Sequence, residues 1–258
     1  MSQLKIASWN VNSLKVRLPH VLDWLVAEQP DVLGLQETKL TDDRFPADVI
    51  NDAGYQVVYA GQPTYNGVAV LSRQAATDVV TDMPGLDDFQ RRVLAVTVGD
   101  LRFINLYVPN GSEVGSDKYA YKLDWLQKLH AWLADEMTRH RNIAVVGDFN
   151  IAPGDDDVHD PEEWRGKILF SEAEHEALGK LLSLGLSDTF RLFPRDDKVF
   201  SWWDYRMNNF RRNRGLRIDL ILASAALAER CIGSHVDVEP RRLERPSDHA
   251  PVVAEFKN

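Results

Sequence analysis

Residues 145–153, VVGDFNIAP, decide the fold of this chain. The stretch begins as a β-branched aliphatic strand and ends in Asp148 and Asn150, which stand on either side of Phe149. Side chains alternate along a strand, so residues two apart face the same way. We therefore expect Asp148 and Asn150 to project together from the end of a buried strand. A carboxylate and a carboxamide at that position indicate a polar site at one edge of a sheet.

Polar strand ends recur elsewhere in the chain. Asn10 and Asn12 are again two residues apart, just after the run LKIAS, and the apolar run VLGLQE finishes on Gln36 and Glu37. One such motif taken alone is more often an Asx turn or a cap. In layered α/β proteins, however, ligands bind where the loops at one end of the sheet meet. Several polar strand ends therefore predict one convergent site.

A buried acid and a histidine add to this set. Asp219 lies inside the apolar run of GLRIDLIL, where an ionised carboxylate is costly unless another group pairs with it. Asp248 and His249 stand directly before another buried strand. A carboxylate next to an imidazole fixes its tautomer and favours its charged form. We predict that Asp219 is the partner of His249.

Tyr107 ends the run INLY and is followed by Pro109 and Asn110. A phenol at this position can donate a hydrogen bond to a phosphate or assist a leaving oxygen. The alternative is a half-buried strand-end tyrosine with no catalytic role.

These residue types favour one kind of chemistry. Glu37, Asp248 and the amide of Asn10 are hard oxygen donors, which suit Mg²⁺ or Mn²⁺ better than zinc. A divalent cation beside a histidine can bind a phosphodiester and stabilise the charge that develops during in-line attack. Asp148 would then take the proton from the attacking water, and Asn150 would orient that water.

Composition excludes several classes of protein. The chain has 258 residues, of which 44% are hydrophobic and 27% charged, so we expect one globular α/β domain over residues 1–258 rather than a disordered or fibrous chain. The net charge of −9 argues against a surface that is basic throughout. Basic residues nevertheless cluster at 90–92, 210–217 and 241–245, which suits an enzyme that touches a phosphate backbone and releases it.

The location of the protein is also constrained. Cys231 is the only cysteine, so an intrachain disulfide and a cysteine-based zinc cluster are excluded. The N-terminus lacks a basic region followed by a long apolar stretch, and no window is long and apolar enough to span a bilayer. We expect a soluble, cytoplasmic monomer with no membrane partner.

Apolar runs alternate with helical patterns along most of the chain. The expected strands are 4–9, 31–36, 56–60, 68–71, 93–98, 101–108, 143–146, 218–223 and 252–256. The expected helices are 16–28, 118–139, 172–184 and 225–230. A faint two-fold echo is present, because each half begins with a strand and a helix and ends in an aliphatic strand near a polar tip.

The chain resembles the exonuclease III family of DNA repair nucleases, within the larger group that includes DNase I and the inositol polyphosphate phosphatases. The matching motifs follow the order of the family: WNVNSLKVRLP, LQETKL, YNGVAVLSR, NLYVPNG, GDFNIAP, FSWWDYR, RGLRIDLIL and ERPSDHAPV. The motifs LQE, GDFN and SDH alone indicate the larger group, whereas YNGVAV, SWWDYR and RGLRIDLIL narrow the resemblance to the bacterial-type DNA enzymes.

The resemblance implies a four-layer α/β sandwich, with two packed mixed β-sheets flanked by helices. It also implies a 3′ to 5′ exonuclease on double-stranded DNA that cuts 5′ of abasic sites and removes blocked 3′ ends, with Mg²⁺ as cofactor and Mn²⁺ as a possible substitute. By position, Glu37 resembles the principal metal ligand, with Asn10 and Asp248 nearby. The remaining catalytic positions would be filled by Asp148, Asn150, Asp219, His249 and Tyr107.

The resemblance also implies which residues contact DNA. Trp202 occupies the position of an aromatic residue that lines a pocket for the abasic sugar, and Leu216 falls where some relatives have a second aromatic residue, which would make the pocket looser. A core role is expected for Trp203. Further DNA contacts are expected at Asn12, Asn110, Arg211 and Arg214.

Two other functions fit part of the pattern. A phosphatase or phosphodiesterase of the larger group, acting on a lipid or inositol phosphate, would share the metal site but lack the Trp202 region and the loop from Arg211 to Arg217. A non-catalytic nucleic-acid-binding relative would have lost Glu37, Asp148 or His249, and all three are present.

Overall fold

The computed structural model describes residues 3–195 and 197–257. In these ranges the strands form two six-stranded mixed sheets. The first sheet has the order β11-β12-β1-β2-β4-β3. Its strands are β1 (Gln3–Asn10), β2 (Val32–Gln36), β3 (Gln56–Ala60), β4 (Val68–Ser72), β11 (Cys231–Val236) and β12 (Val252–Lys257).

The second sheet has the order β5-β6-β7-β8-β10-β9. Its strands are β5 (Ala76–Val80), β6 (Val93–Val98), β7 (Leu101–Tyr107), β8 (Asn142–Asp148), β9 (Leu186–Asp188) and β10 (Asp219–Ser224). The helices are α1 (Leu14–Glu28), α2 (Ala47–Asp52), α3 (Asp117–Arg139), α4 (Pro161–Trp164), α5 (Glu172–Leu182) and α6 (Ala225–Ala228). Short 3-10 turns cover Asp42–Arg44, Asp155–Asp157, Thr189–Leu192, Arg206–Asn208 and Glu239–Arg242.

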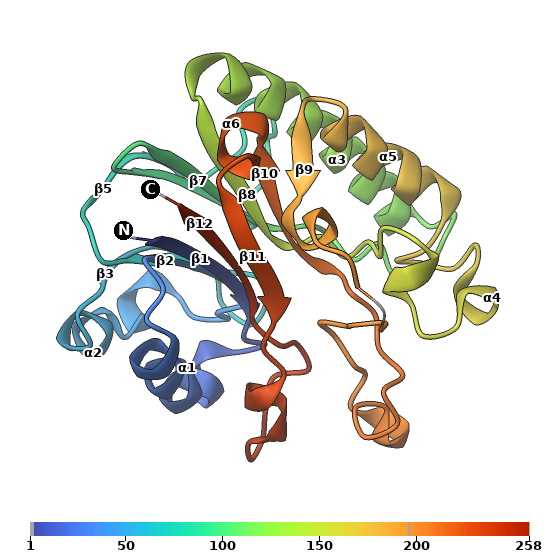
Figure 1. Ribbon diagram of the computed structural model, residues 1–258, viewed down its shortest axis with the longest axis horizontal. Coiled ribbons are helices and arrows are strands. Elements are labelled where there is room, and N and C mark those ends of the chain that lie inside the picture. Colours follow the sequence, from blue (N-terminus) through green and yellow to red (C-terminus); the bar gives the residue numbers. More distant parts are fainter. Residues whose placement is uncertain (1–2, 196, 258) are drawn as a thin grey trace.

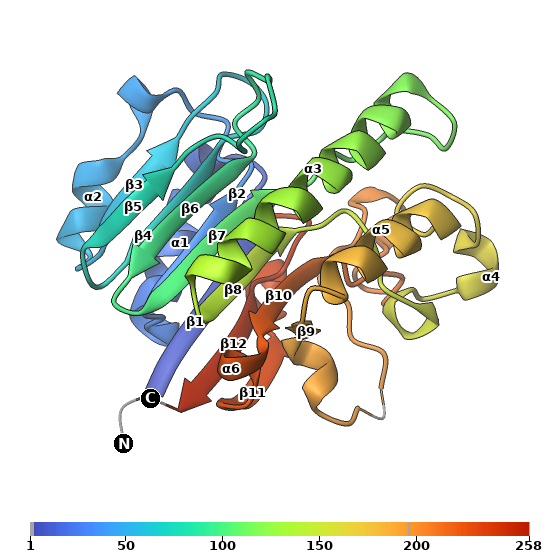
Figure 2. The ribbon, with the colours of Figure 1, turned by 90° about the horizontal axis from the view of Figure 1, so that it is seen from above.

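The two sheets pack face to face, with helices on both outer faces (Figures 1 and 2). Strand periodicity explains this layering, because successive side chains enter different layers. Ile6 and Val146 lie in the core between the sheets, Ala7 faces the layer of α1, and Val145 faces the layer of α3 and α5. The four-layer sandwich expected from the resemblance is confirmed.

Each sheet contains one parallel pair of strands that a helix connects. β1 and β2 are parallel and joined through α1, and β7 and β8 are parallel and joined through α3. Such a connection places the carboxyl ends of both strands at the same edge of the sheet. Asn10 therefore lies opposite Gln36, and Tyr107 lies opposite Asp148. The two-fold echo of the sequence corresponds to these two units.

Gly147 allows the end of β8 to lie close to β7. Its φ is 144°, and a Cβ atom there would lie 1.9 Å from the backbone oxygen of Leu106. A larger residue would therefore push Asp148 away from its neighbour Tyr107.

The predicted strands and helices are confirmed, with ends that differ by about two residues or fewer. The helix predicted at 172–184 ends at Leu182, and the helix predicted at 225–230 ends at Ala228. The sequence prediction did not include β5, β9, β11, α2 and α4. The three missed strands lie at sheet edges, where fewer apolar residues are needed. No helix in the described part of the chain combines the length and the apolar character that a bilayer crossing requires.

Candidate active site

Glu37, Asp148 and His249 meet in one place. One ligand atom from each lies within 4.8 Å of those of the other two. Glu37 follows β2, Asp148 ends β8, and His249 precedes β12, so both sheets contribute to the group. The predicted convergence of residues far apart in the chain is therefore present in the fold. Asp148 and His249 are buried, while Glu37 is partly exposed.

The side chain of Asn10 bridges the two acids. Its Nδ2 donates to Glu37 Oε1 and to Asp148 Oδ2, at 2.9 Å in each case. Its Oδ1 accepts a hydrogen bond from the backbone N–H of Asn12. Glu37 has a φ of 51°, so the chain turns sharply directly after β2 and directs this side chain towards Asn10 and Asp148.

Asp148 is held in a site that disfavours its charge. Burial raises the pKa of its carboxyl group to about 7, although the nearby His249 acts in the opposite direction. Its Oδ1 accepts a hydrogen bond from the backbone N–H of Asn150, and its Oδ2 lies 3.8 Å from Nε2 of His249. The carboxyl group can therefore exchange a proton near neutral pH.

His249 and Asp219 form the predicted pair. Nδ1 of His249 lies 2.9 Å from Oδ2 and 3.1 Å from Oδ1 of Asp219, and Ser201 Oγ donates to the same Oδ2. Burial on its own lowers the pKa of His249, but the carboxylates of Asp219 and Asp148 outweigh it and raise that pKa to about 10. The imidazole is therefore a cation at neutral pH, and Asp219 fixes its orientation.

Asn150 reaches the site by a different route from the predicted one. β8 ends at Asp148, and Asn150 lies in a turn with a φ of 50°, so strand alternation does not align these two side chains. The backbone N–H of Asn150 instead donates to Asp148 Oδ1. Its side-chain Nδ2 donates to the backbone oxygen of Val108, and its Oδ1 accepts from Nδ2 of Asn110. The predicted proximity is present, but an Asx turn produces it.

Tyr107 ends β7 beside Asp148 and lines a cleft of about 610 Å³ with Glu37 and Asn110. Burial, followed by the charge of Glu37, raises the pKa of its phenol well above the ordinary value, so the group keeps its proton. The guanidinium carbon of Arg92 lies 4.7 Å from the centre of the ring. The geometry therefore provides a hydrogen-bond donor at the edge of the acidic group.

Comparison with known proteins identifies the family to which this arrangement belongs. Residues 7–249 match the endonuclease/exonuclease/phosphatase family. The chain belongs to this family. It is 39% identical over 268 residues to an exodeoxyribonuclease III of Haemophilus influenzae, and the match covers 98% of this chain and all (100%) of that protein.

Solved structures of this family share the whole fold. A 3′ phosphatase from Neisseria bound to a product DNA hairpin is 49% identical, with a TM-score of 0.97, and the match covers 99% of this chain and 100% of that one. An AP endonuclease from Archaeoglobus fulgidus is 37% identical, with a TM-score of 0.95 and the same coverage of both chains, 99% and 100%. The predicted resemblance to the exonuclease III group is confirmed.

The donor set of the group fits the divalent cation of such an enzyme. The carboxylates of Glu37 and Asp148 converge, and the carboxamide of Asn10 lies between them with its nitrogen towards both acids and its oxygen bonded to the N–H of Asn12. Oxygen donors of this kind suit Mg²⁺ or Mn²⁺, which are bound through one or two carboxylates and water.

Asp248 lies outside the group of Glu37, Asp148 and His249, although we expected it to be a metal ligand. Its Oδ1 accepts a hydrogen bond from Nδ2 of Asn12, and its Oδ2 accepts one from Nε1 of Trp202. Burial alone would raise the pKa of Asp248, but the charge of His249 and these two hydrogen bonds together lower it. The carboxylate therefore stays ionised and orients Asn12 and Trp202, two of the residues expected to contact DNA.

The side chains of Trp202 and Leu216 differ in their exposure to solvent. Leu216 is completely buried and packs with Val158, Phe170 and Ile218, with Trp202 against the same cluster. Leu216 therefore has no exposed surface that could contact DNA, and it packs beneath Trp202 in the same apolar cluster. Trp202 is partly exposed and forms an isolated bridge with His249, which places it at the border of the site. Trp203 is buried, as expected for a core residue.

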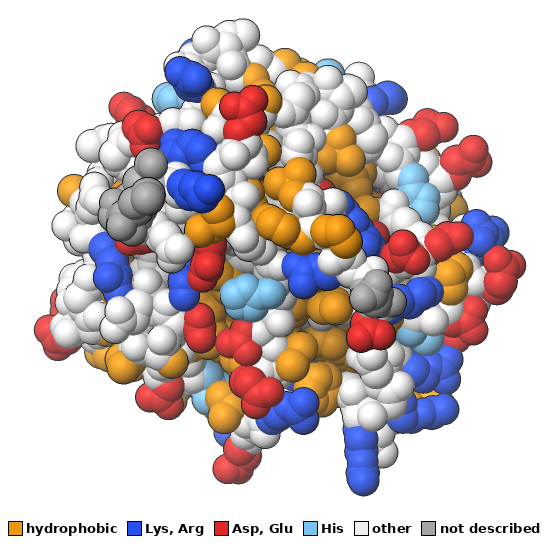
Figure 3. All heavy atoms as spheres, viewed as in Figure 1, with side chains coloured by type: hydrophobic (Ala, Val, Ile, Leu, Met, Phe, Trp, Pro, Cys, Tyr) orange, Lys and Arg blue, Asp and Glu red, His pale blue; other side chains and the backbone are white. Residues whose placement is uncertain are grey.

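The expected basic contacts lie on the segment 204–214, which projects from the body of the molecule (Figure 1). Arg211 is exposed, and basic side chains stand along this projection (Figure 3). Arg214 is tied down, since its NH2 donates to Glu163 Oε2 at 2.6 Å and its Nε donates to His159 at 3.2 Å. Arg211 is therefore freer than Arg214 to meet a phosphate.

Sequence reasoning missed several residues at the site, among them Lys39 and Ser247. Nζ of Lys39 lies 2.9 Å from Glu37 Oε2 and donates to Oδ1 of Asn12. Ser247 Oγ donates to the backbone oxygen of Asn10 and so ties the segment before His249 to the end of β1. Both lie in the motifs LQETKL and ERPSDHAPV, within two residues of Glu37 and Asp248, and this proximity is the sequence signal for them.

Proposed function

We propose that this chain is a divalent-metal-dependent DNA repair nuclease. It would degrade double-stranded DNA from the 3′ end, clean blocked 3′ ends and cut 5′ of abasic sites. The observation that carries this proposal is the convergence of Glu37, Asp148 and His249 within 4.8 Å, in a chain that matches an exodeoxyribonuclease III over its whole length. The names of the solved relatives, a 3′ phosphatase and an AP endonuclease, support the two further activities.

The residues would divide the work of in-line attack by water on phosphorus. Asp148, with a pKa near 7, would take the proton from the water, and the amide of Asn150 would orient that water. His249, held as a cation by Asp219, would contact a phosphate oxygen. Tyr107, which keeps its proton, would donate a hydrogen bond to the same phosphate.

Glu37 and Asn10 would hold the cation. Bound there, Mg²⁺ would stabilise negative charge on the phosphate oxygens, and Mn²⁺ is the expected substitute. The amide of Asn10 donates to Glu37 and Asp148 and accepts from the N–H of Asn12 in this structure, so holding a cation through its oxygen would require this amide to rotate.

Double-stranded DNA is the proposed partner. Trp202, Arg211, Arg214, Asn12 and Asn110 would contact it, with Leu216 acting through Trp202. The Neisseria relative was solved with a DNA hairpin, which supports DNA as the substrate. The single cysteine, Cys231, suits a reducing compartment, and we place the enzyme in the cytoplasm on that basis.

The test uses three labelled duplexes, one blunt, one with an abasic site and one with a 3′-phosphate end. We expect the wild-type protein to process all three with Mg²⁺ and none in excess EDTA. Glu37→Ala should lower kcat/KM by roughly a hundredfold or more, a loss of at least about 2.7 kcal/mol in transition-state stabilisation. Asp43→Ala, an exposed acid of the neighbouring loop, is the matched control and should act as wild type.

Wild-type cutting that EDTA does not diminish would contradict the metal assignment. Hydrolysis of a phosphoinositide in place of all three duplexes would favour a phosphatase of the larger group. Loss of the abasic-site activity alone would leave an exonuclease and 3′-end-cleaning enzyme.

A further inference from the structure

Lys122 of α3 carries a charge in the interior of the protein. Its side chain and that of Glu174 of α5 form an ion pair, and both are 0% exposed. Burial, the largest effect, lowers the pKa of Lys122, although Glu174 acts against it. A buried ion pair is weak evidence for stability, because apolar residues of similar volume often serve as well. The pair therefore calls for an explanation besides stability.

The ammonium group of Lys122 has three N–H donors, and three acceptors surround it. It donates to Glu174 Oε1, to the backbone oxygen of Asn150 at 2.6 Å and to the backbone oxygen of Asn110 at 3.2 Å. Two of the three acceptors thus belong to the turns that follow β7 and β8. These turns carry the linked amides of the candidate active site.

The two turns meet at Lys122. Asn150 has a φ of 50°, and its side chain donates to the backbone oxygen of Val108 and accepts from Nδ2 of Asn110. Its backbone N–H donates to Asp148 Oδ1. Gly111, next to Asn110, packs on the stem of Lys122, since a Cβ atom there would lie 3.1 Å from Cδ of the lysine. Lys122 is therefore the group that joins both turns to α3.

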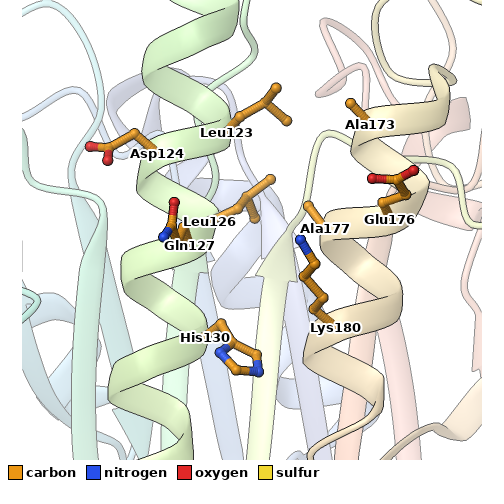
Figure 4. A pocket seen from close by; sticks show the side chains of 9 residues that line it. All are labelled: Leu123, Asp124, Leu126, Gln127, His130, Ala173, Glu176, Ala177 and Lys180. Carbon is orange, nitrogen blue, oxygen red and sulfur yellow. The ribbon is translucent and has the colours of Figure 1, made fainter.

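Glu174 of α5 holds the ammonium group of Lys122 on the side away from the two turns. It closes the capping box at the start of α5, where Oε2 accepts from the N–H and the hydroxyl of Ser171 and Oε1 accepts from the N–H of Leu169. The two helices lie side by side, and the outer groove between them is lined by Leu123 and Ala173, the sequence neighbours of the pair (Figure 4). Lys122 and Glu174 occupy the inner side of this contact.

We propose that Lys122, held by Glu174, is a positioning residue that sets the Asn110–Asn150 amide pair against Asp148. This inference rests on the proposed function, which assigns to Asn150 the orientation of the attacking water. Lys122 touches no substrate in this account. Its loss should therefore lower kcat and leave KM nearly unchanged.

The test compares two buried ion pairs of the same helix. The double variant Lys122→Met/Glu174→Gln removes both charges and keeps an oxygen acceptor for the cap of α5. The matched control is Arg102→Met/Glu136→Gln, because Arg102 of β7 and Glu136 of α3 form another buried ion pair, 3% exposed on each side, that does not contact the two turns. The substrate is a duplex with a 3′-phosphate end, and thermal melting checks that each variant is folded.

We expect the Lys122 double variant to lower kcat by about 10- to 100-fold, with KM changed by less than about twofold. The control variant should lose a similar amount of melting temperature but keep the kcat of the wild-type protein. In an Asn150→Ala background the Lys122 variant should cause little further loss, because both changes remove the same contribution. If the double variant is unfolded at the assay temperature, Lys122→Gln replaces it in the same test. Its shorter side chain cannot reach the backbone oxygens of both Asn110 and Asn150.

A Lys122 variant with wild-type kcat, a loss shared equally with the control, or a loss that multiplies with that of Asn150→Ala would overturn the inference. Failure of the proposed function looks different, since the wild-type protein itself would then leave the duplex intact with Mg²⁺ present.

Discussion

Asp148 and Asp219 lie directly opposite each other in the antiparallel register of β8 and β10. Both carboxyl groups are buried, and His249 contacts both, at 2.9 Å from Asp219 and 3.8 Å from Asp148. The same imidazole therefore lies between two buried acids that have different roles. Asp219 engages the imidazole through Nδ1, whereas Asp148 keeps a pKa near 7.

Replacing Asp219 should remove the charge of His249. The pKa of His249 in the folded protein, about 10, is above its unfolded value, so its stabilising contribution is fully present below about pH 6.5 and is lost as the pH rises through about 10. In Asp219→Asn we expect this decline of melting temperature between pH 6.5 and 10 to flatten and kcat to fall about a hundredfold or more. Titration of the imidazole by NMR checks the cause, and a His249 pKa that stays near 10 in the variant would contradict it.

Asp148 should cost the protein stability at the pH at which it works. Its folded pKa of about 7 lies above the unfolded value of about 3.8, so the folded state binds the extra proton between these values and loses stability as the pH rises from about 4 to 7. Asp148→Asn should therefore melt higher than wild type at pH 8, with a smaller difference at pH 5, while kcat falls at least about a thousandfold. Asp155→Asn, an exposed acid, is the control for both measurements.

Trp202 should govern the preference for abasic sites. Trp202→Ala removes the aromatic ring system and the hydrogen bond from Nε1 to Asp248 Oδ2, whereas Trp202→Phe removes the hydrogen bond but keeps a smaller aromatic ring. We expect Trp202→Ala to lower kcat/KM on an abasic duplex about tenfold more than on a blunt duplex, with Trp202→Phe between it and wild type. An equal loss on both duplexes would assign Trp202 a structural role.

Arg211 should contribute to DNA affinity through phosphate. Because each phosphate contact releases about one counterion, Arg211→Ala should reduce the slope of log K against log salt concentration by about 1. Arg139→Ala, an exposed arginine at the end of α3, should leave the slope unchanged. Binding is measured by fluorescence anisotropy with EDTA present, so that cleavage does not interfere. Identical slopes for both variants would show that Arg211 makes no contact with a DNA phosphate.

The central strands could be predicted because burial on both faces leaves long aliphatic runs, as in VVG before Asp148. The missed strands β5, β9 and β11 are edge strands, and β11 also contains a register shift between Cys231 and Gly233. Nothing in a window of sequence distinguishes such a strand from a loop.

The residues of the site could be predicted more fully than the hydrogen bonds and ion pairs that connect them. Strand ends place Glu37, Asp148 and His249 in one group, since the carboxyl ends of the parallel pairs β1–β2 and β7–β8 lie close to the start of the antiparallel strand β12. The turn at Asn150, the two hydrogen bonds that occupy Asp248 and the pairing of Lys122 with Glu174 depend on contacts between distant segments. Such contacts follow from the packed fold and leave no local pattern.

Binding of Mn²⁺ to the protein, followed by the EPR signal of the free ion, tests the central claim most directly. Wild type and Asp43→Ala should bind the ion alike, and Glu37→Ala should bind it at least about tenfold more weakly while remaining folded. Equal Mn²⁺ affinity in wild type and Glu37→Ala would contradict the account, because Glu37 would then not hold the cation.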